Sequence, residues 1–405
     1  MKDISEIRAD FPILSQTIYG HPLVYFDNGA TTQKPWCVID KMNEVLTTYN
    51  ANIHRGVHTL SDRASEEYER ARETVRSFIN ARKSEEIIFT SGTTGSINAI
   101  AFSFGERFVG KGDEIIISIL EHHSNIVPWQ MLCERKGAKL GIIPINDDGD
   151  IIIDDYLKLL SKKTRLVAIA QVSNSLGTIL PVREIIEAAH SSGIAVLVDG
   201  AQGIQHGVVD VSSMDADFYV FSGHKIYGPT GIGVLYGKEE WLSELPPYQG
   251  GGDMVGNVTF EKTTYNELPF RFEAGTMNYP GAIGLGRALE YITDLGRENI
   301  MEMERKLLDH ANEKLSAIKG LKIYGRPDNK VPIFSFLVDK IHAYDTGMIL
   351  DKMGIAVRTG THCAQPVMNH FGIDGTVRAS MCFYNTLEEI DSLAGGIGKV
   401  ISMFS

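Results

Sequence analysis

Cysteine is scarce in this sequence, and the few cysteines are scattered. The chain has 405 residues and four cysteines, Cys37, Cys133, Cys363 and Cys382, with no CxxC pair among them. This spacing argues against a disulfide framework and a zinc knuckle, which both need closely set cysteines. We therefore predict no metal site, and we expect a reducing compartment, the cytoplasm.

Long apolar runs are also missing. A membrane-spanning helix needs about 18 consecutive apolar residues, and no stretch of the chain approaches that length. The first residues, Met1 to Glu6, are polar and lack the apolar core of a secretory signal. We therefore expect a soluble protein that has no membrane partner.

Positive charge is in deficit. The 51 Asp and Glu residues outnumber the 39 Lys and Arg residues, and the formal net charge is −12. Such an acidic chain argues against nucleic acid or an anionic membrane as its partner. No glycine-rich dinucleotide fingerprint follows a strand and no Walker lysine occurs, so NAD and ATP also fit poorly.

What the chain does contain, from residue 87 onward, is an alternation of apolar strands and helix-length segments. Strands that are apolar throughout are typical of a mostly parallel sheet with helices on both faces. Two apolar runs, Phe218 to Ser222 and Ile232 to Tyr236, flank a Gly-Pro turn and predict a hairpin. The sequence thus predicts an α/β fold.

The length of the chain exceeds that of one ordinary core, so we expect two domains. The large domain is predicted over residues 20–285, and a smaller α+β domain over residues 1–19 and 286–405. Outside the sheet we expect a mostly solvated, charged helix at Ser65 to Ile79 and one long helix at about residues 281 to 317. The glycine-rich stretch from 246 to 281 is predicted to be a functional or interface loop.

Polar clusters follow the apolar strands at their carboxyl ends, where ligands bind in such sheets. The clusters are Ser91 to Ser96, Glu121 to Asn125, Gln171 to Asn174, Asp199 to Gln202 and Ser222 to Lys225. Taken alone, Lys225 is more simply a solvated lysine, and the hydroxyls after Ser91 are more simply an N-cap than a phosphate cradle. Their occurrence together favours a functional site.

One cofactor uses a lysine, an acid and a phosphate cradle together. Pyridoxal phosphate needs a lysine for its Schiff base, a carboxylate for its pyridinium nitrogen and a cup for its phosphate. Lys225, Asp199 and the turn after Ser91 supply these three groups. Cys363 is a candidate nucleophile in an arginine-flanked loop, although composition alone favours a buried, inert thiol.

Several motifs resemble those of the cysteine desulfurases in the class V aminotransferase group. The resemblance is to the SUF-type branch (SufS and CsdA), which is also described as selenocysteine lyase, and it covers essentially the whole chain. The motifs are Asn28-Gly29-Ala30-Thr31-Thr32, His54-Arg55-Gly56, Glu121-His122-His123-Ser124-Asn125, Val198-Asp199-Gly200-Ala201-Gln202, Ser222-Gly223-His224-Lys225, Gly250-Gly251-Gly252, Phe272-Glu273-Ala274-Gly275-Thr276 and Arg358 to Pro366.

This resemblance implies a fold-type I pyridoxal-phosphate-dependent transferase, with a mostly parallel seven-stranded sheet, and a role for each matched residue. Lys225 would carry the cofactor, Asp199 would pair with its ring nitrogen and Gln202 would approach its phenolic oxygen. His122 would stack on the ring and assist proton transfer, and Cys363 would be the nucleophile. The residues that would hold the phosphate are Thr93, Thr94, Ser222, His224 and, from the other subunit, Thr276. The residues that would contact the substrate are Arg378, Asn174, Arg358, His54 and Arg55.

The resemblance also implies the reaction and the partners. L-cysteine would be converted to L-alanine, with a persulfide left on Cys363, to supply sulfur for iron–sulfur cluster assembly, and selenocysteine could be a second substrate. The site would need a homodimer. Because the loop around Cys363 is short, it cannot carry the persulfide far, so an acceptor protein of the SufE or SufU type would have to approach.

Three other interpretations stay open at this point. The first is an aminotransferase or a pure selenocysteine lyase. The second is a non-catalytic scaffold for iron–sulfur assembly that has kept the fold. The third is a metal hydrolase built on His54, His122, His123 and His362, which lacks the ligand spacing of known motifs.

Overall fold

The structure is a computed structural model, and it describes residues 3–327 and 329–404. Its main feature is a seven-stranded sheet with the strand order β4-β10-β9-β8-β7-β5-β6. Only β10 runs antiparallel to its neighbours, β4 and β9, so the mostly parallel α/β sheet is confirmed. The strands are β4 (Ile87–Thr90), β5 (Glu114–Ser118), β6 (Lys139–Ile143), β7 (Thr164–Ala170), β8 (Ala195–Asp199), β9 (Phe218–Ser222) and β10 (Gly233–Gly237).

Helices cover both faces of this sheet, and alternate residues of each strand face opposite sides. On β7, Leu166 and Ala168 belong to the core formed with α4 (Thr93–Phe108) and α5 (Val127–Lys136). Their neighbours Val167 and Ile169 belong to the core formed with α3, α7 and α11. This double burial explains why the strands are apolar throughout. The other helices of this part are α2 (Trp36–Thr48), α3 (Thr59–Phe78), α6 (Ile153–Leu159), α7 (Val182–His190), α8 (Gly203–His206), α9 (Val211–Met214) and α10 (Glu239–Glu244).

The predicted hairpin is formed by β9 and β10, and its connection begins with a short 3-10 turn, Gly223–Lys225. β10 passes so close to the start of α4 that a Cβ at Gly233 would lie 2.4 Å from the Cα of Gly92. Only glycine fits at this contact. The close approach brings the lysine turn beside the helix start at Thr93.

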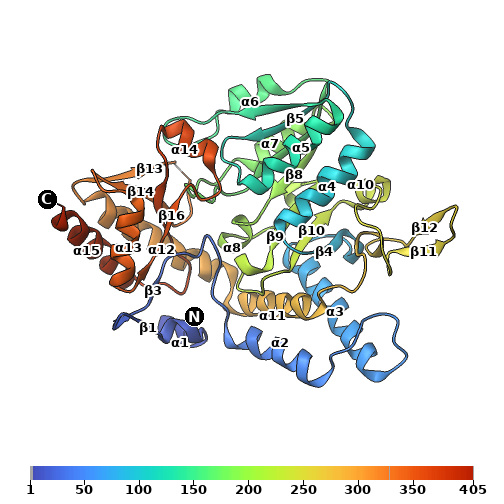
Figure 1. The fold of residues 1–405 in the computed structure, drawn as a ribbon, viewed down its shortest axis with the longest axis horizontal. Helices are drawn as coiled ribbons and strands as arrows, with labels where there is room; N and C mark the ends of the chain where they lie inside the picture. Colours follow the sequence, from blue (N-terminus) through green and yellow to red (C-terminus); the bar gives the residue numbers. More distant parts are fainter. Residues whose placement is uncertain (1–2, 328, 405) are drawn as a thin grey trace.

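A second, antiparallel sheet has the order β13-β14-β17-β16 and its own apolar core (Figure 1). A segment near the N-terminus adds to this part, because β3 (Val24–Tyr25) pairs with β15 (Ile355–Ala356) and Asp27 bridges Ser380. The predicted domain limits stay a prediction. The elements are β13 (Leu321–Tyr324), β14 (Ile333–Val338), β16 (Arg358–Gly360), β17 (Thr376–Ser380), α12 (Arg297–Ser316), α13 (Ala343–Lys352), α14 (Gln365–Phe371) and α15 (Leu387–Met403).

One expected helix and one expected loop differ in the structure. The single helix expected over residues 281 to 317 is wrong, because Gly296 adopts a φ of +83° and divides it into α11 (Tyr279–Leu295) and α12. The stretch expected as a loop from 246 to 281 contains a small hairpin, which projects at one end of the molecule (Figure 1). The remaining short elements are α1 (Ile4–Ala9), β1 (Thr17–Ile18), β2 (His21–Pro22), β11 (Val255–Val258) and β12 (Thr263–Tyr265). Among the described residues, no helix combines the length and the apolar character that a membrane span requires.

Helix α3 starts at Thr59, earlier than expected, and its interior is not only a solvated face. Arg72 is 1% exposed and forms a buried ion pair of 2.7 Å with Glu273. Glu273 also accepts hydrogen bonds from the Tyr68 hydroxyl (2.8 Å) and from the Phe89 backbone N–H of β4 (2.7 Å). This network fixes the loop around Glu273 to both α3 and the sheet.

We expect Glu273→Ala to lower the free energy of unfolding by about 3–5 kcal/mol, because it removes the buried counter-charge of the Arg72 guanidinium and leaves only the exposed Glu69 as its ionic partner. Urea unfolding followed by circular dichroism measures this change. The matched control is Glu73→Ala, which removes an exposed pair with Arg76 on the same helix and should cost less than about 1 kcal/mol. Equal losses in the two variants would contradict the role assigned to Glu273.

Candidate active site

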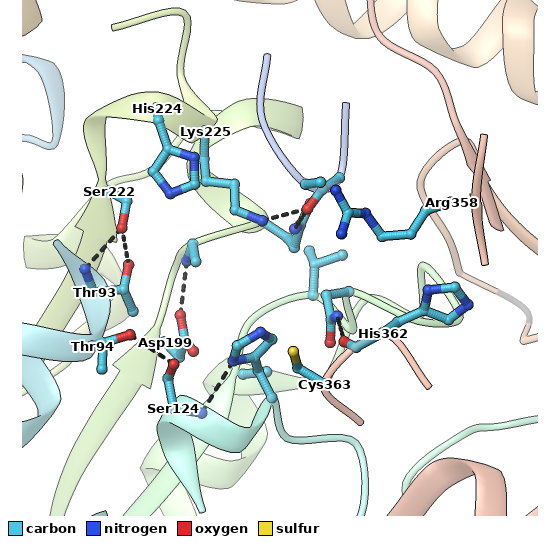
Figure 2. A pocket seen from close by; sticks show the side chains of 18 of the residues that line it. Thr93, Thr94, Ser124, Asp199, Ser222, His224, Lys225, Arg358, His362 and Cys363 are labelled. Carbon is cyan, nitrogen blue, oxygen red and sulfur yellow. Dashed lines mark hydrogen bonds between the residues drawn. The ribbon is translucent and has the colours of Figure 1, made fainter. Parts of the chain in front are cut away.

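A cavity of about 310 Å³ lies at the carboxyl ends of β4, β7, β8 and β9, where the small sheet meets the large one. Figure 2 shows Lys225, Asp199 and Cys363 around this one space, with the hydroxyls of Thr93, Thr94 and Ser222 at one end. The cavity is lined by Gly29, Ala30, Thr93, Thr94, His122, Ser124, Ala170, Val172, Asn174, Asp199, Ala201, Gln202, Ser222, His224, Lys225, Arg358, His362, Cys363 and Arg378.

Lys225 is half-buried at the cavity wall, where the 3-10 turn after β9 places it. Its ammonium group donates a hydrogen bond to the backbone carbonyl of Gly29. Burial, assisted by the positive charge of Arg378, lowers the pKa of Lys225 to about 7. A substantial fraction of this amine is therefore neutral, and thus nucleophilic, near neutral pH.

Asp199 and Gln202 form the wall that follows β8. The Asp199 carboxylate accepts one hydrogen bond, of 2.9 Å, from the backbone N–H of Ala201, and burial raises its pKa to about 6. Gln202 donates to the Gly29 carbonyl at 2.8 Å, and its buried Oε1 has no partner among the described residues. Both side chains keep acceptor capacity that a bound cationic or N–H group would satisfy.

Backbone N–H groups and hydroxyls gather at the N-terminus of α4. Gly92 has a φ of +143°, and the Ser222 hydroxyl contacts both the backbone N–H and the hydroxyl of Thr93, each at 2.8 Å. Thr94 bonds the Ser124 hydroxyl at 2.7 Å. A helix N-terminus with free N–H groups and hydroxyls favours a phosphate. His224 also lines this cavity, and burial lowers its pKa to about 4.

His122 lies in the loop after β5 and lines the same cavity. Its Nδ1 accepts a hydrogen bond of 3.0 Å from the backbone N–H of Ser124. Burial and the nearby charge of Lys225 lower the pKa of His122 to about 4. The ring is therefore neutral at pH 7, and its proton is on Nε2.

Glu121, the residue before His122 in this loop, is fully buried. Its carboxylate accepts hydrogen bonds from Ser118 (2.5 Å), Asn125 (2.6 Å) and the backbone N–H of Ala170 (3.0 Å). Burial raises the pKa of Glu121 to about 7. These three bonds join the ends of β5 and β7 to the loop that carries His122.

The small sheet supplies Cys363, Arg358 and Arg378. Cys363 is exposed and lines the cavity. Both guanidinium groups interact electrostatically with Cys363. Asp27 accepts hydrogen bonds from Arg358 (2.8 Å and 3.0 Å) and from Arg378 (3.3 Å).

Arg378 is 2% exposed and donates to the backbone carbonyl of Asn174 at 2.9 Å. Its buried Nε has no partner among the described residues, which leaves one donor for an anionic ligand. Asn174 donates its amide to the carbonyl of His362 at 2.7 Å and keeps an unpartnered Oδ1. Arg378 therefore keeps a donor for a substrate carboxylate, and the second N–H of the Asn174 amide is also free to donate.

Most of the predicted site residues thus line one cavity, but His54, Arg55 and Thr276 do not. Arg55 pairs with Asp253 at 2.6 Å, and the His54 ring packs on Tyr68. For these three residues the predicted roles stay predictions. Sequence reasoning missed Asp27 and Ser124 as parts of the site, although Ser124 lies in a motif that the resemblance had singled out and Asp27 directly precedes another.

Residues 24–393 match the family model described as Aminotransferase class-V. The chain belongs to this family. It is 51% identical over 398 residues to the cysteine desulfurase of Escherichia coli O9:H4 (strain HS), and the match covers 98% of each protein. A cysteine desulfurase of Synechococcus elongatus is also 51% identical, and this match covers 98% of the chain but 64% of that longer protein.

Solved structures agree with this assignment. The cysteine desulfurase CsdA (S-sulfonic acid) from Escherichia coli superposes with a TM-score of 0.92 at 38% identity, covering 100% of this chain and 99% of that one. The apo cysteine desulfurase from Thermococcus onnurineus NA1 gives a TM-score of 0.94 at 41% identity, covering 99% of both chains. The predicted fold class and family are therefore confirmed.

Class V aminotransferases are pyridoxal-phosphate enzymes, and the cavity fits this cofactor. The orphaned Oε1 of Gln202 and the under-bonded carboxylate of Asp199 suit the polar edge of the ring. The donors at the start of α4 suit its phosphate. The part-neutral amine of Lys225 suits its aldehyde, because only an unprotonated amine attacks a carbonyl.

In the cofactor-free protein, we expect the acylation of Lys225 by acetic anhydride to rise with pH through a midpoint near 7, because burial lowers the pKa of this amine to about 7. Ordinary surface lysines should rise through about 10.4 in the same samples and act as the internal control. Mass spectrometry of the peptides measures each midpoint. A Lys225 midpoint at the value of the surface lysines would contradict the burial argument.

Proposed function

We propose that this chain is a pyridoxal-phosphate-dependent cysteine desulfurase that releases L-alanine and keeps the sulfur of L-cysteine as a persulfide on Cys363. The observation that carries the proposal is the convergence of Lys225, Asp199 and Cys363, which are far apart in the sequence, on one cavity. The relatives that share half of its residues are cysteine desulfurases, which supports the same reaction here.

The cofactor's role and the residues that would hold it follow from the cavity. Pyridoxal phosphate, when bound, supplies a ring that withdraws electrons from Cα of an amino acid. Asp199 would keep the ring nitrogen protonated, and Gln202 would contact the phenolic oxygen. Thr93, Thr94, Ser222 and His224 would hold the phosphate, and His122 would stack on the ring.

The chain's own groups then bind the substrate and move its proton. Arg378 would bind the carboxylate of L-cysteine through the guanidinium donor that is free in the structure. Lys225 Nζ would take the proton from Cα, which is possible because its lowered pKa leaves the amine unprotonated. Arg358 would lie beside the sulfur of the substrate.

Cys363 would complete the reaction by attacking the substrate's sulfur atom. A new S–S bond forms, the Cβ–S bond of the substrate breaks, and its electron pair goes to Cβ, which takes up a proton. The sum is L-cysteine plus the Cys363 thiol giving L-alanine plus the Cys363 persulfide, so no outside oxidant is required. The persulfide sulfur is then available to a second thiol.

We expect Cys363→Ala to abolish the release of alanine from L-cysteine while the yellow absorbance of the bound cofactor persists, because Cys363 is the sulfur acceptor. Alanine is measured by amino-acid analysis and the cofactor by absorbance. Cys37→Ala, a half-buried thiol outside the cavity, is the control and should keep its activity.

Turnover of L-cysteine by Cys363→Ala at a near-normal rate would reject the persulfide mechanism. Elimination from selenocysteine should survive this substitution better, since selenium needs no attack by the thiol. A purified protein that stays colourless after pyridoxal phosphate is added would instead favour the scaffold interpretation.

We further propose that the working form is a homodimer in which His54, Arg55 and Thr276 act toward the site of the other subunit. Two observations support this arrangement. These residues lie outside the cavity of their own chain. Val57, two residues after Arg55, and Phe260, on the hairpin that begins just after Asp253, the partner of Arg55, are fully exposed in the single chain (100% and 108%), as expected of surface that a second copy covers.

Light scattering during size-exclusion chromatography should therefore give twice the 44.7 kDa chain mass. Replacing the exposed Phe260 by Glu should shift the protein toward the monomer and lower desulfurase activity in parallel, because each site would lose its second subunit. The control Phe404→Glu alters an exposed aromatic residue near the C-terminus, and the dimer should persist. A fully active monomer would contradict the shared site.

The proposal also covers the protein that accepts the sulfur and the use made of it. Cys363 sits in a short loop between β16 and α14, so the persulfide stays at the mouth of the cavity. An acceptor protein of the SufE or SufU type would dock there and take the sulfur for iron–sulfur cluster assembly in the cytoplasm. The proposed substrates are L-cysteine and, secondarily, selenocysteine.

A further inference from the structure

The loop that carries Cys363 has a strained backbone. His362 and Cys363 both have a left-handed conformation, with φ of +54° and +55°. A residue other than glycine held in this region costs of the order of 1–3 kcal/mol. Two such residues in succession persist only if the surroundings hold them, so the contacts of this loop decide where the thiol points.

Three polar contacts from the large-sheet part hold this loop, and His123 makes two of them. The backbone N–H of His123 donates to the carbonyl of Cys363 at 2.7 Å. The Nε2 atom of its imidazole accepts from the backbone N–H of Gln365 at 3.2 Å. The third contact is the amide of Asn174, which donates to the carbonyl of His362 at 2.7 Å.

The imidazole contact has a clear physical reason. Helix α14 starts at Gln365, and a helix start leaves backbone N–H groups without partners. Ala364 at the N-cap offers no side-chain acceptor, and Pro366 has no N–H. The His123 ring therefore takes the part of a capping side chain, although it belongs to the loop between β5 and α5.

We infer that His123 is a positioning residue that fixes the Cys363 thiol at the cavity for sulfur abstraction. The inference rests on the proposed function, because it concerns the residue that accepts the sulfur. His123 itself does not line the cavity, unlike its neighbour His122. It bonds the carbonyl of Cys363 and the backbone N–H of Gln365, on either side of Ala364. These bonds join the loop of Cys363 to the loop of His122.

The imidazole bond can be removed without the backbone bond. His123→Phe keeps a flat ring of similar size but has no acceptor, whereas His123→Gln can place a carbonyl oxygen near the position of Nε2. The control is His310→Phe, which removes an exposed hydrogen bond of 2.9 Å between His310 on α12 and Asp391 on α15. All variants are compared as holoenzymes with equal cofactor absorbance.

For His123→Phe we expect kcat for alanine release to fall roughly tenfold, which corresponds to the loss of about one hydrogen bond. KM for L-cysteine should change less than about twofold, since Arg378 is untouched. Alkylation of Cys363 by iodoacetamide in the resting enzyme should become severalfold faster, because the loop is released. His123→Gln should recover most of both properties, and His310→Phe should match the parent protein.

The result separates this inference from the proposed function. If Cys363→Ala is inactive but His123→Phe shows parental kcat and alkylation rates, Cys363 is the acceptor and His123 does not position it. If His123→Phe loses cofactor absorbance, or raises KM as much as it lowers kcat, its role is general to the fold and the inference is overturned. If Cys363→Ala stays active, the proposed mechanism itself is wrong.

Discussion

The site depends on taking charged groups out of water at one edge of a parallel sheet. Asp199 and Arg378 are nearly inaccessible to solvent, and the amine of Lys225 lies in the same cavity. Burial raises the pKa of Asp199 to about 6 and lowers that of Lys225 to about 7. Such a desolvation cost is typical of functional sites, and a bound pyridine ring with a substrate would supply the partners that these groups lack.

The polar residues at this edge of the sheet could be predicted from the sequence because they follow local patterns. Strands buried on both faces are apolar from end to end, and the polar residues that follow them mark the ligand edge. Asp199 ends β8 and Lys225 lies in the turn directly after β9, so their meeting follows from the topology of a parallel sheet. The mostly parallel sheet and the hairpin whose connection carries Lys225 could be predicted in this way, whereas the count of seven strands and the family were implied by the resemblance of the motifs.

The features that could not be predicted from the sequence depend on contacts between distant segments, which no local pattern reveals. The charges of α3 predict a solvated face, but Arg72 is buried because Glu273, two hundred residues away, neutralises it. The break at Gly296 is also invisible, because one glycine in a helical pattern costs only about 1 kcal/mol. The left-handed pair at Cys363 is set by His123 and Asn174, which lie in other parts of the fold.

The two arginines beside Cys363 show how a local strand pairing and a contact from a distant segment act together. Arg358 and Arg378 are paired directly across the antiparallel strands β16 and β17, where like charges repel. Asp27 approaches from the N-terminal segment that pairs with the small sheet, and it accepts hydrogen bonds from both. One carboxylate cannot balance two guanidiniums, so an excess of positive charge remains beside the cavity. Charge-assisted hydrogen bonds make a carboxylate the kind of ligand that this excess favours, which is what the proposed binding of an amino acid beside Cys363 requires.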